Sequence, residues 1–496
     1  MSRERDALPA LPPLVALTGL GAVVMLIAAL HAAETGDGRM ARAFVYHAAL
    51  ITTGAVIVAL ALAPSRRRGG GAREQLLGLA AAFTLWPALM ALPIADGLQV
   101  GFGRSWAELI SAATTTGAEF IPHAALPRSA LLYLGLVAWL GGLVWLVGVI
   151  AVLAPLELGG FELFAHARHR RAMRLGGGEN PLAWPRQRLR RALRLAAPPY
   201  VALTAVLWLA LVLAGHRSFD ALLWAMGTLA TSGIGPAGAA APPGIAGQAL
   251  VAAFLLAALS RAVLIAPSGG ERRAAVLRAD PELRLGLGLI AAVVLFTLLR
   301  HASVGEAGRS LYTMWSELFT LLSFLTTAGW SAPGWALLGP WSGLDAPGLL
   351  LLMLALIGGG IATTAGGIKL LRVWALAGQS RRELERLIEP SSVGGAGRAL
   401  RREGAVIAWV AFMLLLCTAA AVMAAVTVDG VPFEAAAVHA LAALTTTGPL
   451  VGMIDGGLPP AGALDSFAQG ALAAAMVVGR LETLVVVALF NPDFWR

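Results

Sequence analysis

Four short segments of the sequence end in the tripeptide Thr-x-Gly, whose residues can surround a cation with oxygen atoms. Threonine supplies hydroxyl oxygens, and glycine allows the backbone to turn its carbonyl oxygens toward one axis. Rings of such oxygens replace the hydration shell of potassium in channel filters. We therefore predict a potassium ion in a pore. The filter residues are Thr115, Thr116 and Gly117; Thr231, Ser232 and Gly233; Thr327, Ala328 and Gly329; and Thr446, Thr447 and Gly448.

Each tripeptide follows a stretch that predicts a helix of about three turns, which is too short to cross a bilayer. Ser105 with Glu108 has the spacing of a capping box, Ser218 and Asp220 can cap the second helix, and Pro432 suits a first helical position. The C-terminal ends of these helices would carry roughly half a negative charge each and favour a cation. Irregular backbone after them is tolerated at membrane depth only where it lines a path for ions or water.

A second cluster of unusual residues is the glycine-rich run at 358–367, followed by Lys369, which is the single lysine of the chain. Each glycine costs about 1 kcal/mol relative to alanine within a helix, so the run predicts an unwound loop inside the membrane. The alternative is close helix packing through small residues. The loop and the cations near it comprise Gly358, Gly359, Gly360, Thr363, Thr364, Gly366, Gly367, Lys369 and Arg480.

Arg480 lies midway along the last apolar segment, where a charge costs about 2.5 to 3.5 kcal/mol if it faces lipid. It therefore faces a water-filled cavity or a partner. One interpretation is a pair with Glu482 or with a neighbouring carbonyl group. The other is a positive obstacle to cations beneath the filter. Arg372 lies near a cytoplasmic end, where we expect its side chain to extend to the interface.

Composition places these residues in a membrane. Of the 496 residues, 58% are apolar and 13% charged, and the mean hydropathy is +0.76, which exceeds that of water-soluble proteins. We predict an all-α integral membrane protein with ten transmembrane helices and four re-entrant pore helices in a pseudo-fourfold repeat around one pore. The ten spans lie at about 11–30, 44–63, 76–94, 131–153, 197–213, 247–265, 283–299, 347–377, 405–426 and 464–490.

The same pattern divides the chain into five parts. They are two leading helices (1–75), repeat 1 with a cytoplasmic linker (76–196), repeat 2 (197–282), repeat 3 with a broken gate helix (283–401), and repeat 4 with the C-terminus (402–496).

The charges predict topology rather than nucleic-acid binding. Most arginines flank the spans in segments 64–75, 154–196, 267–284 and 378–404, so these segments and both termini are expected to be cytoplasmic and to meet anionic lipids. We expect no enzyme activity, since the chain lacks HExxH and any paired acidic motif within a span. The GLGLIA run at 286–291 lies inside an apolar span, and Cys417 stands alone, which leaves no disulfide or thiolate metal site.

Five motifs carry a family resemblance: TTTGAEF at 114–120, LTTAGW at 325–330, LTTTGPLVG at 444–452, GGGIATTAGGIKLLR at 358–372 and GRLETLVVVALFNPDFWR at 479–496. With them the sequence resembles the TrkH/KtrB superfamily of bacterial potassium transporters, in its TrkH branch. The resemblance implies a homodimer with one pore per subunit in the bacterial cytoplasmic (inner) membrane. It also implies a TrkA-type cytosolic regulatory protein that binds nucleotides, no covalently bound cofactor, and a gate formed by the loop at 358–367.

The predicted function is potassium uptake through a channel-like pore, driven by the membrane potential, which supplies about 2.3 kcal/mol per charge per 100 mV. Two alternatives remain: a less selective sodium/potassium transporter, and a non-conducting sensor on the same fold. Glu119 departs from the plainer family pattern. It is either a carboxylate that attracts cations to the outer mouth or a solvated loop charge.

Overall fold

The computed structural model describes residues 13–62, 71–156, 158, 160–161, 185–237, 240–260, 270–304, 310–388, 398–454 and 457–490. Every regular element within these ranges is helical. Both chain termini and most of the predicted linker after repeat 1 lie outside the described residues.

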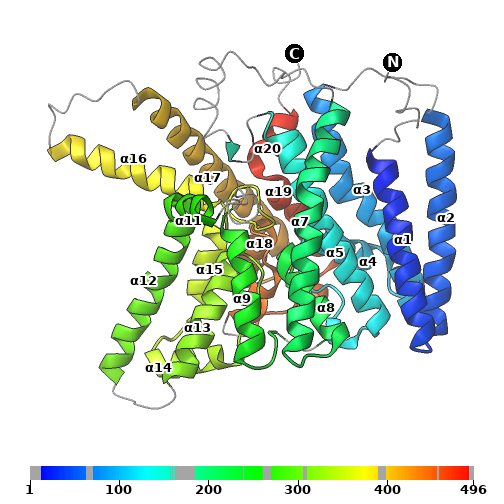
Figure 1. Ribbon diagram of the computed structural model, residues 1–496, viewed down its shortest axis with the longest axis horizontal. Helices are drawn as coiled ribbons and strands as arrows, with labels where there is room; N and C mark the ends of the chain where they lie inside the picture. Colours follow the sequence, from blue (N-terminus) through cyan, green and yellow to red (C-terminus); the bar gives the residue numbers. More distant parts are fainter. Residues whose placement is uncertain are drawn as a thin grey trace.

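The chain begins with a pair of helices, α1 (Pro13–Glu34) and α2 (Gly38–Leu62), which pack along each other at one edge of the molecule (Figure 1). The turn between them is tight because Gly36 adopts a φ of +79° and the carboxylate of Asp37 accepts the backbone N–H of Met40 at 3.1 Å. Met25 of α1 and Phe44 of α2 are fully buried, so the two helices pack against the rest of the protein.

Four successive units then place a short helix between two further apolar helices. The short helices are α4 (Phe102–Ala113), α8 (Ser218–Ala230), α13 (Ser310–Leu325) and α18 (Phe433–Leu444). The helices before them are α3 (Ala72–Leu98), α7 (Pro185–Leu213), α12 (Pro281–Val304) and α17 (Arg398–Thr427). Those after them are α5 (Arg128–Gly148), α9 (Ile245–Leu259), α15 (Gly348–Ile357) and α19 (Ser466–Leu481). The remaining helices are α11 (Gly270–Ala279), α14 (Leu338–Ser342), α16 (Leu370–Ile388) and α20 (Thr483–Phe490).

Seven helices in the described ranges are long and apolar enough to cross a membrane, and the pair α19 and α20 would make an eighth. The two other predicted spans contain shorter apolar helices, since α9 has 15 residues and α15 has 10. The ten spans expected from the sequence thus correspond to seven long helices, one bent pair and two shorter helices.

Two of the apolar segments are interrupted. Helix α15 ends at Ile357 and α16 begins at Leu370, so the glycine run between them is unwound, as the sequence predicted, and is not a tightly packed helix. The second interruption was not predicted: α19 and α20 meet at an angle of 94°, and Glu482 between them has a φ of +67°. Helices α16 and α17 extend away from the bundle on one side (Figure 1).

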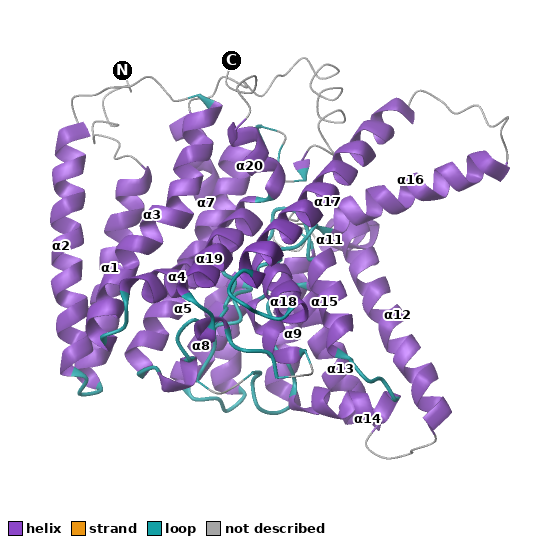
Figure 2. Cartoon of the chain, turned by 180° about the vertical axis from the view of Figure 1, so that it is seen from behind, coloured by secondary structure: helices purple, strands orange, loops and turns teal. Residues whose placement is uncertain are grey.

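Helix α5 lies in the interior and packs closely through glycine against two of the short helices, α4 and α8. A methyl group built on Gly141 would overlap the carbonyl group of Ala113, the last residue of α4. One built on Gly142 would lie 2.7 Å from the hydroxyl of Tyr200 and 3.2 Å from Cα of Ala230, the last residue of α8. The loops that follow the short helices gather in the interior beside this contact (Figure 2).

Replacing Gly141 by valine therefore tests the packing of the centre. We expect Gly141→Val to destabilise the protein by about 1–3 kcal/mol, the usual range for overpacking, because the new side chain meets backbone that cannot rotate away. The measurement is the midpoint of thermal unfolding in detergent. Gly78→Val on α3 is the matched control, because nothing lies within 4 Å of that position. An equal shift in both variants would contradict this packing.

Candidate functional site

All four short helices end in the same backbone turn, made by the threonine of each Thr-x-Gly. Thr115 donates its N–H to Ala112 at 2.9 Å, and Thr116 donates to Ser111 at 2.8 Å. This pair of bonds is a Schellman motif, and the other three helices repeat it. The equivalent donors are Thr231 and Ser232, Thr327 and Ala328, and Thr446 and Thr447.

The turn forces threonine into a conformation that glycine normally occupies. The φ values of Thr115, Thr231, Thr327 and Thr446 are +54°, +50°, +57° and +53°. A left-handed conformation costs about 1–2 kcal/mol for an L-residue, and a β-branched side chain makes it rarer still. The positions of these threonines follow from the sequence, whereas their left-handed conformation does not. In all four places the residue in this conformation is threonine.

The four segments after these helices meet in a closed ring. Methyl groups built on Gly117 and Gly448 would overlap, respectively, the carbonyl oxygen of Ser232 and the backbone of Ala118. Gly233 and Gly329 both face Pro449, and a methyl group on either would lie 2.7 Å from its Cγ.

One hydrogen bond also joins repeat 4 to repeat 1, from the N–H of Gly448 to the carbonyl of Thr116 at 2.7 Å. Gly117, Gly233 and Gly329 adopt positive φ. Gly448 does not have a positive φ. Glycine is required at this position because the backbone of Ala118 leaves no room for a side chain.

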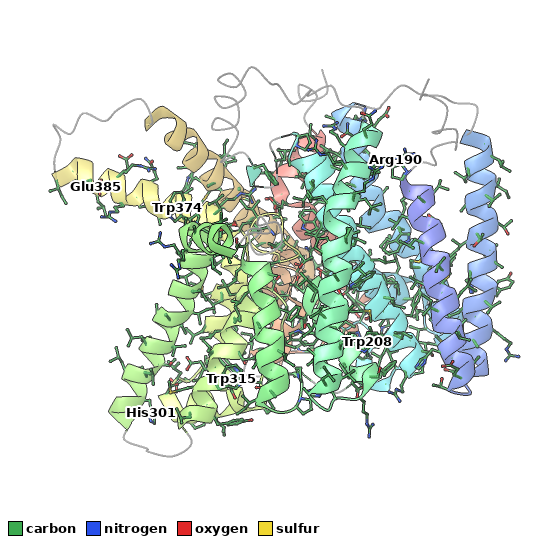
Figure 3. The ribbon with its side chains drawn as sticks, in the orientation of Figure 1. Arg190, Trp208, His301, Trp315, Trp374 and Glu385 are labelled. Carbon is green, nitrogen blue, oxygen red and sulfur yellow. The ribbon has the colours of Figure 1, made fainter. Side chains whose placement is uncertain are left out.

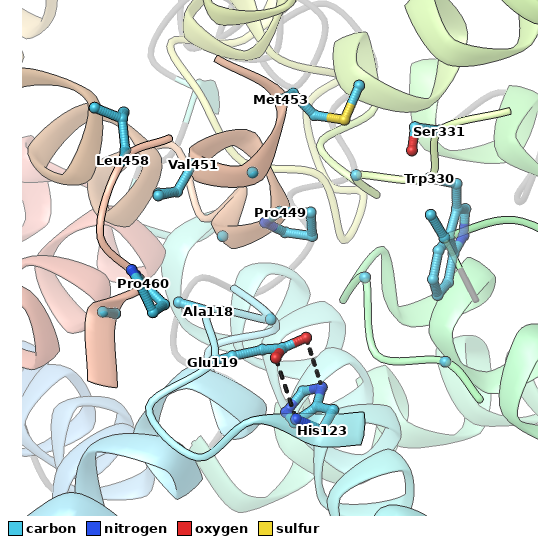
Figure 4. A pocket seen from close by; sticks show the side chains of 18 of the residues that line it. Ala118, Glu119, His123, Trp330, Ser331, Pro449, Val451, Met453, Leu458 and Pro460 are labelled. Carbon is cyan, nitrogen blue, oxygen red and sulfur yellow. Dashed lines mark hydrogen bonds and ion pairs between the residues drawn. The ribbon is translucent and has the colours of Figure 1, made fainter. Parts of the chain in front are cut away.

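A cavity of about 500 Å³ opens on one side of this ring and is lined by all four glycines (Figure 4). Glu119 and His123 lie on its wall, where Nδ1 of His123 is 3.5 Å from Oε1 of Glu119. The Glu119 side chain is 49% exposed and pairs with His123, and neither its predicted role in attracting cations nor the alternative of a solvated loop charge is decided by this contact.

Behind the first segment, Glu108 has a different role from the capping predicted for it. Helix α4 begins at Phe102, Ser105 is buried inside the helix without a hydrogen-bond partner for its hydroxyl, and the capping-box prediction is wrong. The Glu108 carboxylate instead binds His123 Nε2 at 2.7 Å. Burial alone would lower the pKa of His123, but the carboxylates of Glu108 and Glu119 raise it above its ordinary value.

On the opposite side of the ring, a buried arginine contacts the threonine turns directly. Nε of Arg480 donates to the carbonyl of Thr114 at 2.7 Å, and Nη2 donates to the hydroxyls of Thr115 and Thr446. The guanidinium is 5.5 Å above the ring of Trp145. Arg480 is thus bound to carbonyl and hydroxyl oxygens and not to Glu482.

The unwound loop lies against the same turns. Nη1 of Arg480 donates to the Thr364 carbonyl at 2.6 Å, and the N–H of Gly366 donates to the hydroxyl of Thr327 at 2.8 Å. The Thr364 hydroxyl donates to the carbonyl of Leu229 in α8 at 3.0 Å. The predicted loop residues 358–367 therefore form one segment, which contacts helix α8, the turn at Thr327 and Arg480.

Two side chains outside the glycine run hold the loop and carried no signal in the sequence. Trp145 donates its Nε1–H to the carbonyl of Thr363 at 3.0 Å, and the Glu282 carboxylate accepts the N–H of Ile361 at 2.7 Å. At the start of the loop, Gly360 donates its N–H to Ala258 in α9 at 3.0 Å, and Gly358 folds back against Gly366. The loop is anchored at both ends.

The cations after the loop are buried. Lys369 donates to the carbonyl of Ala365, and Arg372 forms an ion pair with Glu482 at 2.7 Å. Arg372 is 3% exposed, so the expectation that it extends to the interface is wrong. Its partner stands at the 94° bend between α19 and α20, and this contact was invisible in the sequence because the two residues are 110 positions apart. No group of three or more His, Cys, Asp or Glu side chains suited to a metal ion occurs in the described part of the chain.

These features define a multi-pass membrane protein whose polar centre is built from four converging helix ends. A family model described as TrkH, cation transport protein, matches residues 286–495. The Trk system potassium uptake protein TrkH of Salmonella typhimurium is 30% identical over 451 residues, covering 87% of this chain and 88% of that protein. The TrkH protein of Escherichia coli K12 is 29% identical over 448 residues, with coverage of 87% and 88%.

The fold agrees with these sequence matches. The crystal structure of the potassium transporter TrkH from Vibrio parahaemolyticus superposes with a TM-score of 0.78 at 25% identity, covering 97% of this chain and 98% of that one. The chain belongs to the TrkH family, and the family resemblance found in the sequence is confirmed.

The ion pair beside the loop yields a test of the electrostatics. Replacing Glu482 by glutamine removes a buried partner of Arg372, so we expect a loss of about 3 kcal/mol in stability. Thermal unfolding in detergent measures it. Glu385→Gln is the matched control, since the Arg381–Glu385 pair has side chains 84% and 61% exposed, and such pairs contribute about 0–1 kcal/mol. Glu385 lies on the part of α16 that extends from the bundle (Figure 3). Equal effects would contradict the burial of Arg372.

Proposed function

We propose that this chain takes up potassium ions across the bacterial cytoplasmic membrane through a channel-like pore with a four-part selectivity filter and an intramembrane gate. The observation that carries the proposal is the closed ring of four Thr-x-Gly segments, each of which begins with a left-handed threonine. The names of the relatives, potassium uptake proteins, support the choice of ion.

The proposed filter is lined by backbone oxygens from the twelve residues named in the sequence analysis. Four helix C-termini, each carrying about half a negative charge, end at the ring and stabilise a cation there. A potassium ion that enters from the cavity beside Glu119 would exchange its water for these oxygens. The Glu119 carboxylate at the wall of that cavity raises the local concentration of cations.

The proposed gate is the loop at 358–367 together with Lys369 and Arg480. Arg480 places a positive charge directly against the threonine turns, which raises the energy of a cation leaving the filter. Opening requires that the bond from Arg480 to Thr364 and the bond from Gly366 to Thr327 break. Residues 364–367 can then move away from the turns while Glu282 and Trp145 still hold Ile361 and Thr363.

The finer architecture belongs to the same proposal. The placement of a short helix between two further apolar helices in each of the four units supports ten spans with four re-entrant pore helices, divided as 1–75, 76–196, 197–282, 283–401 and 402–496. We place the arginine-rich segments and both termini in the cytoplasm. Family membership leads us to propose a homodimer with one pore per subunit and a TrkA-type cytosolic regulator that binds nucleotides.

The direct test is ion flux into proteoliposomes with potassium, rubidium, sodium and lithium, paired with growth of potassium-uptake-deficient cells at micromolar potassium. Flux that favours potassium and rubidium, with restored growth, is the expected result. Equal flux of sodium would favour the less selective transporter, and absence of flux with no growth would favour the non-conducting sensor.

Gly233→Ser tests the filter. The φ of Gly233 is +65°, and a Cβ there would lie 3.0 Å from the carbonyl of Ala328, so a side chain strains the ring. We expect the permeability ratio of potassium to sodium to fall at least fivefold, equivalent to about 1 kcal/mol of strain. Gly244→Ser is the control, because Gly244 has a φ of +79° with no atom within 4 Å. An unchanged ratio in Gly233→Ser contradicts the filter assignment.

Arg480→Ala tests the obstacle. Removing the charge should raise basal potassium flux at least tenfold, which corresponds to about 1.4 kcal/mol off the barrier. Flux is measured in proteoliposomes without any regulatory protein. Arg480→Lys keeps the charge and should remain near the unmodified rate, and Arg381→Ala, at an 84% exposed position, should have no effect. If Arg480→Ala leaves the flux unaltered, the arginine is a structural anchor only.

A further inference from the structure

One position on each short helix contacts the chain segment that leaves the ring, which we call the outgoing arm of that repeat. It lies nine residues before the glycine of the Thr-x-Gly. The four residues at this position differ in chemistry, yet all are at least 98% buried. They are Glu108, Trp224, Thr320 and His439.

In repeats 1 and 3 this side chain accepts the same backbone N–H. Oε2 of Glu108 accepts the N–H of Phe120 at 2.8 Å, and the Thr320 hydroxyl accepts the N–H of Ala332 at 3.1 Å. Phe120 and Ala332 both stand three residues after their glycines. Glu108 also accepts the next N–H, that of Ile121, at 2.9 Å. A carboxylate in repeat 1 and a hydroxyl in repeat 3 thus accept the equivalent backbone N–H.

In repeats 2 and 4 the contact has another form. The ring of Trp224 lies 3.2 Å from the position of a Cβ on Gly235, two residues beyond the glycine of its own repeat. It also meets the ring of Trp330 in the arm of repeat 3, with centroids 4.7 Å apart and planes tilted by 66°. Nε2 of His439 is 2.9 Å from the carbonyl of Pro459 in the arm of repeat 4.

A second row of contacts lies six residues before the glycine. The Ser111 hydroxyl donates to the carbonyl of Ala118 at 2.9 Å, and the Ser323 hydroxyl accepts the N–H of Trp330 at 2.6 Å. Both partners directly follow the glycine. Each arm in these two repeats is therefore held at two successive levels by its own short helix.

We propose that the side chain nine residues before each filter glycine is a positioning residue that sets ion selectivity by holding the outgoing arm, with Glu108 and Thr320 acting through backbone hydrogen bonds. This inference rests on the proposed function of the ring as a filter. In repeats 1 and 3 the residues directly after the filter glycine, 117–122 and 329–332, have no regular hydrogen bonding of their own, and a buried N–H without an acceptor is unfavourable. An arm fixed to its helix keeps the ring at the width that suits potassium. A released arm lets the oxygens close around the smaller sodium ion.

Thr320 offers the cleanest experiment, because valine has nearly the shape of threonine and lacks only the oxygen. We expect Thr320→Val to lower the potassium-to-sodium permeability ratio about fivefold, which converts to about 1 kcal/mol, the net worth of one buried hydrogen bond. Thr320→Ser keeps the oxygen and should retain the ratio of the unmodified protein. Thr418→Val is the matched control, since the Thr418 hydroxyl bonds only within α17, to Leu414 at 2.7 Å.

Glu108 provides an independent pair. Glu108→Gln keeps an oxygen for the N–H groups of Phe120 and Ile121 and should change the ratio less than twofold. Glu108→Leu removes that acceptor and should lower the ratio at least fivefold, equivalent to about 1 kcal/mol or more. Elution of each variant as a single species in size-exclusion chromatography verifies folding. If Glu108→Leu does not fold, the Thr320 variants alone decide.

Two results would overturn the inference. In the first, Thr320→Val keeps the ratio of the unmodified protein. In the second, Thr320→Ser loses selectivity as fully as Thr320→Val, which would assign the effect to packing and not to the hydroxyl. Failure of the proposed function is distinct, because the unmodified protein would then show no potassium-selective flux.

Discussion

The carbonyl ends of four short helices meet in the interior of this protein. The negative potential that they create is neutralised by hydrogen-bond donors from other parts of the structure. A helix C-terminus leaves carbonyl groups without intrahelical partners, and burying four such ends together is unfavourable without a cation or a set of donors. The Schellman turns satisfy part of this demand. Arg480 satisfies more of it, since its guanidinium binds the carbonyl of Thr114 and the hydroxyls of two of the left-handed threonines.

The same guanidinium also binds the carbonyl of Thr364 in the unwound loop. One side chain therefore joins the ring to the loop, so any movement of the loop changes how the ring is neutralised. This link gives a physical basis for coupling between the proposed gate and the proposed filter. The ion pair of Arg372 with Glu482 fixes the start of α16 to the bend after Arg480. This one contact therefore holds both the end of the loop and the helix that carries Arg480.

A ring made from four repeats of one chain need not be symmetric, and this ring is not. Pro449 faces the glycines of repeats 2 and 3 from one side, and Gly448 approaches Ala118 on the other. The arms are held by a carboxylate, an indole, a hydroxyl and an imidazole in turn. Because each quarter is encoded separately, its rigidity can be changed without changing the other three. Four identical subunits would not allow this.

The sequence by itself determined the membrane environment, the four Thr-x-Gly positions, the unwinding at 358–367 and the family. These follow from local composition and from short motifs, which act over a few residues. The tertiary structure decided what the sequence could not, because it depends on contacts between distant residues. Glu108 looked like a helix cap, yet the carboxylate turns toward Phe120, twelve positions along the chain. Arg372 looked exposed until Glu482 was placed beside it. The positive φ of the four threonines was not predictable from residue type, since threonine disfavours it. The Schellman turns stabilise it in all four repeats, and bonds to the loop and to Arg480 add to this at Thr327, Thr115 and Thr446.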